Sequence, residues 1–117
     1  MNFKNGVSFI VTVYNKEGFI EKTLESIFTQ MNTSTQLIVV NDGSTDSSLK
    51  KIKEIVRRKK LDIKLITQKN SGPSIAINHA LKFVKYSFIK LVDGDDFTAN
   101  PKKTKRNSRK GQVTVVS

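Results

Sequence analysis

The sequence predicts an α/β domain with a mostly parallel sheet and helices on both faces, and two observations lead to this prediction. Short apolar runs rich in β-branched residues alternate with longer segments whose apolar residues recur every three or four positions. The resulting order is β-α-β-α-β-α-β, and each connection is long enough for a right-handed crossover between parallel strands. The chain has 117 residues, which is the size of one domain.

The first strand is expected at residues 7–13, where an apolar run shows little alternation, as in a strand buried on both faces. A helix should follow, because apolar side chains recur at helical spacing from Phe19 to Met31. Residues 37–40 form a second short apolar run, which predicts the next strand.

A turn after the second strand leads into a second helix. Ser44, Thr45 or Asp46 can cap this helix, which is expected to run to about Lys60. Residues 63–67 are the third predicted strand.

Pro73 lies at or near the first position of a third helix, where its missing N–H has no cost. The apolar positions of this helix extend to Val84, and residues 88–92 form the fourth predicted strand. In such sheets, ligands bind beyond the carboxyl ends of the strands, so those ends are the first place to look for a site.

Residues 1–101 are therefore expected to form one domain, and residues 102–117 a basic tail. The net charge is +11, and the tail contributes six Lys and Arg residues and no acid. Residues 113–116 can pair as a short edge strand or remain unstructured. The tail favours nucleic acid or an anionic membrane surface as a partner, although a solvated tail explains its composition equally well.

Composition excludes several classes of protein. The chain has no cysteine and one histidine, His79, so disulfides, thiolate metal sites and multi-histidine zinc sites are excluded. His79 is interpreted as a surface or internally satisfied helical residue. Neither a dinucleotide fingerprint nor a P-loop occurs. With no apolar run of membrane-spanning length and no secretory signal, we expect a cytoplasmic protein, with peripheral binding at the inner face of the membrane as an option.

Half of the acidic residues lie in two predicted loops at the carboxyl ends of strands. Of the ten acids, Asp42 and Asp46 lie in one loop, and Asp93, Asp95 and Asp96 lie in the other. Three carboxylates this close repel one another unless a cation neutralises them. Mg²⁺ or Mn²⁺ with a diphosphate fits, because these ions combine one or two protein carboxylates with phosphate oxygens. An acid-rich turn that caps the next element is the alternative.

Two further residues are candidates for nucleotide contact. Asp42 can accept hydrogen bonds from a base N–H or a ribose hydroxyl, whereas a turn with a helix cap explains its neighbours completely. Tyr14 can place an aromatic ring beside a base, although an ordinary strand-to-helix turn explains it as well.

Taken together, these segments resemble the start of a family 2 glycosyltransferase with the GT-A fold, whose nucleotide-binding half is Rossmann-like. The resemblance covers roughly residues 5–101 and rests on four motifs in register. The first two matching stretches are residues 7–15 with Glu17, and residues 39–46. The third runs from Asn70 to Ala76 and includes Asn78 and Ala80, and the fourth is residues 93–96 with Pro101.

The resemblance implies an inverting transferase that uses a nucleotide-diphosphate sugar, commonly a UDP-sugar. By position, Tyr14 and Glu17 would line the nucleotide pocket and Asp42 would contact the base. Asp93 would lie near the ribose and the sugar.

The resemblance also implies a divalent cofactor, Mn²⁺ or Mg²⁺. Asp95, the second acid of the D-x-D motif, would be the principal metal ligand, with Asp96 beside it. Such a cation would neutralise charge that develops on the leaving diphosphate.

The sequence departs from the family pattern after this motif. Relatives continue into an acceptor-binding half with a general-base carboxylate, but no Asp or Glu follows Asp96, and Ile77 stands where many relatives have arginine. The expectation is a truncated nucleotide-binding half that is inactive alone, with no catalytic residue assigned. A non-catalytic nucleotide-binding module is one alternative, and a binder of nucleic acid or membrane through the basic tail is another. An uncovered edge or apolar face would favour a homo-oligomer.

Overall fold

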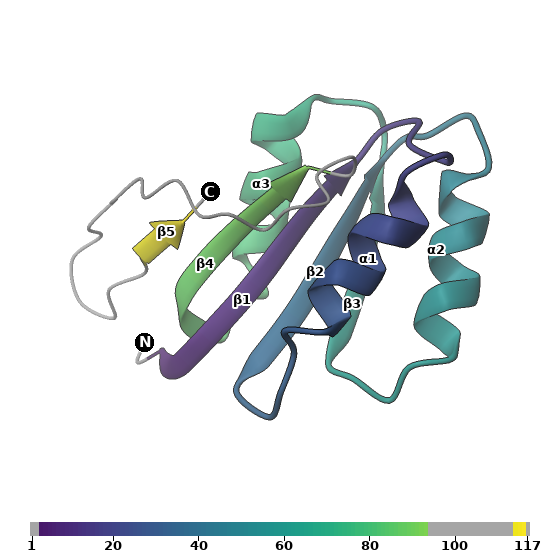
Figure 1. Cartoon of the computed structure of the whole chain (residues 1–117). Coiled ribbons are helices and arrows are strands. Elements are labelled where there is room, and N and C mark those ends of the chain that lie inside the picture. Colours follow the sequence, from purple (N-terminus) through teal and green to yellow (C-terminus); the bar gives the residue numbers. More distant parts are fainter. Residues whose placement is uncertain (1–2, 94–113, 117) are drawn as a thin grey trace.

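A computed structural model of the chain describes residues 3–93 and 114–116. It contains one parallel sheet with helices on both faces, as the sequence predicts (Figure 1). The strand order is β3-β2-β1-β4-β5, and every neighbouring pair is parallel. The elements in chain order are β1 (Lys4–Val13), α1 (Ile20–Phe28), β2 (Thr35–Asp42), α2 (Ser48–Arg57), β3 (Ile63–Gln68), α3 (Pro73–Leu81), β4 (Tyr86–Asp93) and β5 (Thr114–Val116).

The predicted element order is confirmed, and the differences lie at the boundaries. β1 begins at Lys4, before its apolar run, because the main chain of Lys4 already pairs with Tyr86 on β4. α1 ends at Phe28, and the apolar Met31 follows it in a turn that packs against the core. Pro73 is the first residue of α3, as expected. The short edge strand was one of two options for the C-terminal segment, and its main chain pairs with β4.

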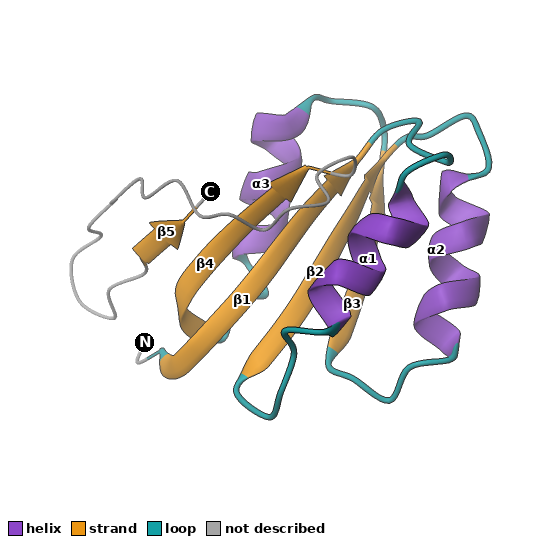
Figure 2. Cartoon of the chain, viewed as in Figure 1, coloured by secondary structure: helices purple, strands orange, loops and turns teal. Residues whose placement is uncertain are grey.

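The core has two layers, one on each face of the sheet. α1 and α2 cover one face and α3 covers the other (Figure 2). On the first face, Leu24 and Ile27 of α1 and Ile52 of α2 pack against Phe9 and Val39 of the central strands. The side chains of β2 are buried along its whole length, so this strand lies at the centre of the core.

The second face is covered by a helix with small buried side chains. Ala76 and Ala80 of α3 are fully buried and pack against Ile10, Ile38 and Ile89 of the sheet. Because alanine occupies little volume, α3 lies close to the sheet, and its first turn is held near the carboxyl ends of β2 and β3. This placement matters for the site.

The strand register brings the carboxyl ends of four strands to one edge of the sheet. Val13 of β1 lies opposite Asn41 of β2, and Asp42 lies opposite Gln68 of β3. Thr12 of β1 lies opposite Asp93 of β4. The described site residues at strand ends therefore lie together along the carboxyl ends of β1 to β4, which we call the carboxyl edge.

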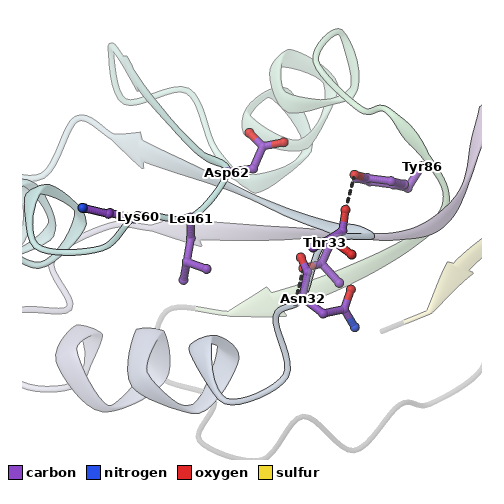
Figure 3. Close-up of a pocket in the computed structure, with 7 residues that line it drawn as sticks. Asn32, Thr33, Lys60, Leu61, Asp62 and Tyr86 are labelled. Carbon is purple, nitrogen blue, oxygen red and sulfur yellow. Dashed lines mark hydrogen bonds between the residues drawn. The ribbon is translucent and has the colours of Figure 1, made fainter.

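A shallow pocket lies at the other end of the strands, where β2, β3 and β4 begin (Figure 3). Its volume is about 340 Å³, and it is lined by Asn32, Thr33, Thr35, Lys60, Leu61, Asp62 and Tyr86. The Tyr86 hydroxyl donates to the Thr33 carbonyl oxygen at 3.4 Å. None of the residues predicted to bind nucleotide lines this pocket.

Among the described residues, no helix has the length and apolar character to cross a bilayer.

Candidate functional site

The carboxyl edge is built from the loops that follow β1, β2 and β3. The first loop turns sharply at Asn15, whose φ of 51° lies in the left-handed region that asparagine tolerates. Asn15 Oδ1 accepts hydrogen bonds from the main-chain N–H of Thr45 at 2.8 Å and of Asp46 at 3.2 Å. In return, the main-chain N–H of Asn15 donates to Ser44 Oγ at 3.0 Å. The loops after β1 and β2 therefore form one hydrogen-bonded unit.

Glu17 ties the first loop to the start of α2. Its carboxylate Oε2 accepts from the Ser47 main-chain N–H at 3.1 Å, and its carbonyl oxygen accepts from Lys51 Nζ at 2.8 Å. Glu17 thus lies at the carboxyl edge, and its place in a nucleotide pocket stays a prediction. Its carboxylate is already engaged in satisfying an orphan N–H at the start of a helix.

Asp46 closes the same unit from the other side. Its Oδ1 accepts from the Ser48 main-chain N–H at 2.9 Å, and its Oδ2 accepts from the Glu17 N–H at 3.1 Å. Burial acts to raise the pKa of Asp46, but hydrogen bonds from Ser48 and Glu17 outweigh it and lower the pKa. Of the three predicted capping residues, Asp46 is the one that binds an N–H of the first turn of α2.

Asp42 is the most constrained carboxylate of the carboxyl edge. It is 4% exposed, and both oxygens accept hydrogen bonds from the end of β3 and the loop that follows. Oδ1 accepts from Gln68 Nε2 at 2.9 Å and from the Ser71 N–H at 2.8 Å. Oδ2 accepts from the Gly72 N–H at 3.0 Å, with Asn70 Nδ2 at 3.4 Å. Asp42 therefore holds the β3–α3 loop against the end of β2.

These contacts keep Asp42 ionised although it is buried. Burial would raise the pKa of this carboxyl, yet the hydrogen bonds from Gln68, Ser71 and Gly72 lower it below the ordinary value. The carboxylate is a fixed negative charge with most of its acceptor positions filled. It suits recognition of an N–H or O–H donor better than coordination of a metal ion.

Gly43 lets the second and third loops approach each other. Its φ is 70°, and a Cβ at this position would lie 2.6 Å from the main-chain nitrogen of Asn70. Asn70 in turn donates from Nδ2 to the Asp42 carbonyl oxygen at 3.0 Å. A side chain on residue 43 would separate the loops and break this contact.

Gln68 ends β3, at one of the strand ends where a ligand was expected, but its contacts with Asp42 and His79 were not predicted from the sequence. Gln68 Nε2 donates to Asp42, and the other end of the same amide, Oε1, lies 3.1 Å from His79 Nδ1. His79 was interpreted as a surface or internally satisfied residue, and its half-buried ring is internally satisfied. The pairing of Asp42 with Gln68 follows from the β2–β3 register, and that register was the one signal that could have indicated it.

Besides the exposed Glu17, two further predicted contacts lie exposed at the carboxyl edge. Tyr14 follows β1, and its side chain is 45% exposed. Asp93 is the last residue of β4, and its side chain is exposed. Both are accessible to a ligand that lies across the strand ends. Asp95 and Asp96, the predicted metal ligands, lie outside the described residues.

The described carboxylates fit a divalent cation only in part. No group of three His, Asp or Glu side chains within residues 3–93 is arranged to hold a metal ion. Asp42, Asp46 and Glu17 accept hydrogen bonds from the protein itself. Glu17 and Asp93 are the exposed carboxylates among the described residues of this edge, and Glu17 accepts the Ser47 N–H. A metal site built on Asp93 would need further ligands, for which residues 95 and 96 are the candidates. The metal assignment therefore stays a prediction.

Known proteins resemble this chain over most of its length. The model of the family described as Glycosyl transferase family 2 matches residues 8–105. An uncharacterized glycosyltransferase of Haemophilus influenzae is 35% identical over 100 residues, which are 86% of this chain and 40% of that protein. The teichoic acid poly(glycerol phosphate) polymerase of Staphylococcus epidermidis is 40% identical over 97 residues, which are 82% of this chain and 14% of that protein. The chain thus spans less than half the length of these relatives.

Solved structures show the same arrangement of strands and helices. S. aureus TarS 1-349 in complex with UDP-GlcNAc superposes with a TM-score of 0.71 at 36% identity, covering 79% of this chain and 27% of that one. The mannosyltransferase PcManGT from Pyrobaculum calidifontis in complex with GDP-Man and Mn²⁺ gives a TM-score of 0.72 at 24% identity, covering 80% of this chain and 28% of that one. At that identity, the second likeness shows the fold alone. Both confirm the predicted α/β fold.

Proposed function

Because the chain belongs to glycosyl transferase family 2 and has its GT-A type of fold, we propose that its carboxyl edge binds the nucleotide of a UDP-sugar. One observation carries this proposal: the buried, ionised Asp42 stands at the strand ends, with an exposed aromatic ring, Tyr14, on the same edge. The relative TarS, at 36% identity, is described in complex with UDP-GlcNAc, which supports uracil as the base.

The chemistry of Asp42 favours a base with an N–H donor. A carboxylate only accepts hydrogen bonds, so it binds the N3–H of uracil and repels the unprotonated N3 of cytosine. Charge-assisted bonds of this kind are about twice as strong as neutral ones. Tyr14 can add stacking area from the edge of the site, as aromatic rings do for bases.

We include a divalent cation in the proposal, with Asp93, Asp95 and Asp96 as the residues that would hold it. The exposure of Asp93 at the end of β4 supports this part, and the two other acids follow it two and three positions later in the sequence. When bound, Mn²⁺ or Mg²⁺ would neutralise negative charge on the diphosphate. The role of this chain's own residues is to hold the nucleotide across the strand ends.

Inverting transfer of the sugar is the reaction we propose for the whole enzyme. It needs a base that removes a proton from the acceptor hydroxyl. Asp42, Asp46 and Glu17 are poor candidates, because their carboxylates accept hydrogen bonds from loop N–H groups. This observation favours a second candidate function, a module that binds nucleotide without turning it over.

Calorimetric titration of the purified chain with UDP, with and without Mn²⁺, tests the binding proposal. We expect UDP to bind more tightly with the metal, and ADP and CDP to bind more weakly than UDP. A folded chain that binds none of these nucleotides would refute the proposal. Hydrolysis or transfer of UDP-GlcNAc, measured in the same samples, separates the two functions: release of UDP supports the transferase, and binding without release supports the module.

We also propose that the protein associates with an anionic membrane surface. The basic tail predicted to do so lies outside the described residues except for 114–116, and α2 offers a further basic surface among the described ones. This helix buries Ser48, Ile52 and Ile55, so the exposed Lys50, Lys53 and Arg57 lie on its outward side. Glu54 is the one acid of α2 on that side, which leaves the surface net basic. Basic residues near an anionic surface contribute about 1 kcal/mol each.

Co-sedimentation with vesicles tests the membrane proposal. We expect binding to vesicles that contain phosphatidylserine, loss of this binding in high salt, and loss in the variant Lys50→Glu with Arg57→Glu. The exposed Lys82→Glu on the α3 side is the matched control. Equal binding to neutral vesicles would contradict an electrostatic interaction, and binding of the wild type to RNA alone would replace the membrane with a nucleic-acid partner.

A further inference from the structure

We propose that Gln68 and His79 are positioning residues for nucleotide recognition, with His79 holding the Gln68 amide against the carboxylate of Asp42. This inference rests on the proposed function and deepens it. The three side chains come from the end of β2, the end of β3 and the last turn of α3. They form a continuous chain of hydrogen bonds, from Asp42 Oδ1 to Gln68 Nε2 at 2.9 Å, and from Gln68 Oε1 to His79 Nδ1 at 3.1 Å.

The chemistry of the groups decides which one donates in each of these two hydrogen bonds. The Asp42 carboxylate only accepts, so the Gln68 amide must turn its NH₂ group toward it. The Gln68 oxygen then faces the imidazole, so His79 Nδ1 must carry a hydrogen and donate it. The reversed amide would place two oxygens against each other on the Asp42 side, and His79 could accept from its NH₂ group only in the other tautomer. Asp42 therefore selects the orientation of Gln68, and His79 holds the amide there by donating to its oxygen.

The position of His79 is set by packing and not by the hydrogen bond alone. Its neighbours on α3, Ala76 and Ala80, are fully buried against the sheet, which fixes the helix. The ring is half-buried and lies 6.5 Å from the ring of Phe83, centroid to centroid. A donor held this firmly at the end of the amide limits the rotation of the Gln68 side chain.

The two oxygens of Asp42 differ in how firmly they are occupied. Oδ1 has two short contacts, from Gln68 and from the Ser71 N–H. Oδ2 has one short contact, from the Gly72 N–H, and a longer one of 3.4 Å from Asn70 Nδ2. The Asn70 contact is the weakest of the four, so it is the one that an incoming N–H donor displaces.

Base recognition therefore depends on Gln68 staying in place. While Gln68 and Ser71 hold Oδ1, the second oxygen keeps its direction toward the ligand. If the Gln68 amide rotates away, the Ser71 N–H is the one short contact left on Oδ1, so the carboxylate is held less firmly and the acceptor for the base is less well placed. His79 acts on the base through two intervening side chains and does not touch it.

The test compares three variants of α3 by their ratio of UDP to CDP affinity. His79→Leu removes the donor, and His79→Asn retains one, because the amide nitrogen of asparagine takes about the place of Nδ1. Lys82→Ala is the matched control at an exposed position after α3. We expect His79→Leu to lower the ratio about five- to tenfold, the effect of misplacing one hydrogen bond, with His79→Asn near wild type and Lys82→Ala unchanged.

A loss that affects UDP and CDP equally would overturn the proposal, because a merely structural defect does not discriminate between bases. The proposal would also be overturned if His79→Asn lowered the ratio of UDP to CDP affinity as far as His79→Leu does. Gln68→Leu removes the amide that contacts Asp42, so it should lower the ratio of UDP to CDP affinity at least as far as His79→Leu does.

A measurement without nucleotide separates this inference from the proposed function. The main-chain N–H groups of Ser71 and Gly72 both donate to Asp42, so their hydrogen exchange reports how firmly the carboxylate is held. We expect exchange to be several-fold faster in His79→Leu than in wild type or His79→Asn. If the wild type binds no nucleotide, the proposed function fails, and unchanged exchange in His79→Leu would overturn the positioning role itself.

Discussion

Asn15 and Thr45 are 30 positions apart in the sequence, yet Asn15 Oδ1 accepts the Thr45 N–H at 2.8 Å. One side chain thus joins the loop after β1 to the loop after β2. The left-handed backbone at Asn15 is what directs its amide toward the second loop. The geometry of these two loops depends on this contact, and Glu17 and Asp46 complete the same unit.

Replacement of Asn15 should separate the backbone contribution from that of the side chain. Asn15→Ala loses both the hydrogen bonds and the tolerance for a positive φ, so we expect it to lower the free energy of unfolding by about 2–3 kcal/mol. Asn15→Gly keeps the backbone conformation and should lose about half as much. Urea denaturation measures both, and Asn78→Ala, an exposed asparagine of α3, is the control. Equal losses in the two Asn15 variants would show that the φ angle contributes nothing.

Asp42 should make the free energy of unfolding depend on pH in the acidic range. Burial raises its pKa, but hydrogen bonds from Gln68, Ser71 and Gly72 lower it below 3.8, the value expected for the unfolded chain. A carboxyl with a lower pKa in the folded state stabilises the protein fully above the unfolded pKa, and that stabilisation is lost as the pH falls through the folded pKa.

Asp42→Asn should therefore be less stable than wild type at neutral pH, and the difference should shrink as the pH falls below 3.8. Thermal unfolding across this pH range measures the effect. Asp62→Asn is the control, because this aspartate is exposed and forms a surface ion pair with Lys85 at 2.7 Å. A constant difference between Asp42→Asn and wild type at every pH would contradict the assignment.

Gly43 and Gly18 form a matched pair for testing the loop approach. A Cβ at Gly43 would lie 2.6 Å from the Asn70 nitrogen, whereas a Cβ at Gly18 meets nothing within 4 Å. We expect Gly43→Ala to cost about 1–3 kcal/mol of stability, from strain at a positive φ together with the collision. Gly18→Ala should stay within about 0.5 kcal/mol of wild type. A stable Gly43→Ala with unchanged UDP affinity would show that the loops can move apart freely.

The metal proposal makes a prediction of its own at Asp95. Asp95→Ala should abolish the gain in UDP affinity that Mn²⁺ provides and leave the melting temperature near wild type. Asp42→Ala should instead weaken UDP more than it weakens free Mn²⁺. Calorimetry with each ligand alone and with both together distinguishes these outcomes. Unchanged metal dependence in a folded Asp95→Ala chain would exclude this residue as the principal ligand.

The sequence predicted the architecture well because the relevant signals are local. The apolar run of residues 7–13 and the helical spacing of Leu24 and Ile27 arise from burial, and burial is a property of each segment. The acids at strand ends were recognisable because they follow the apolar runs closely in the sequence. The early start of β1 at Lys4 was missed because polar residues can pair through the main chain without an apolar pattern.

The interior of the site could not be predicted in this way. The bonds from Asp42 to Gln68 and from Gln68 to His79 join residues 26 and 11 positions apart. They depend on the register of two strands and on the rotation of a helix, which single-residue preferences do not specify. The role of Glu17 as a nucleotide contact stays a prediction, and its bond to the N–H of Ser47 has no sequence signature.

The place of β1 in the sheet also has a consequence for how the chain matures. β1 pairs with β2, which follows it closely, and with β4, where the Tyr86 N–H reaches Ser8 Oγ across 78 positions. During synthesis, β1, β2 and β3 can assemble before residues 86–93 leave the ribosome. Until then, one edge of a strongly apolar strand stays open to other chains. We therefore expect β4 to set the pace of folding, and nascent chains without it to aggregate.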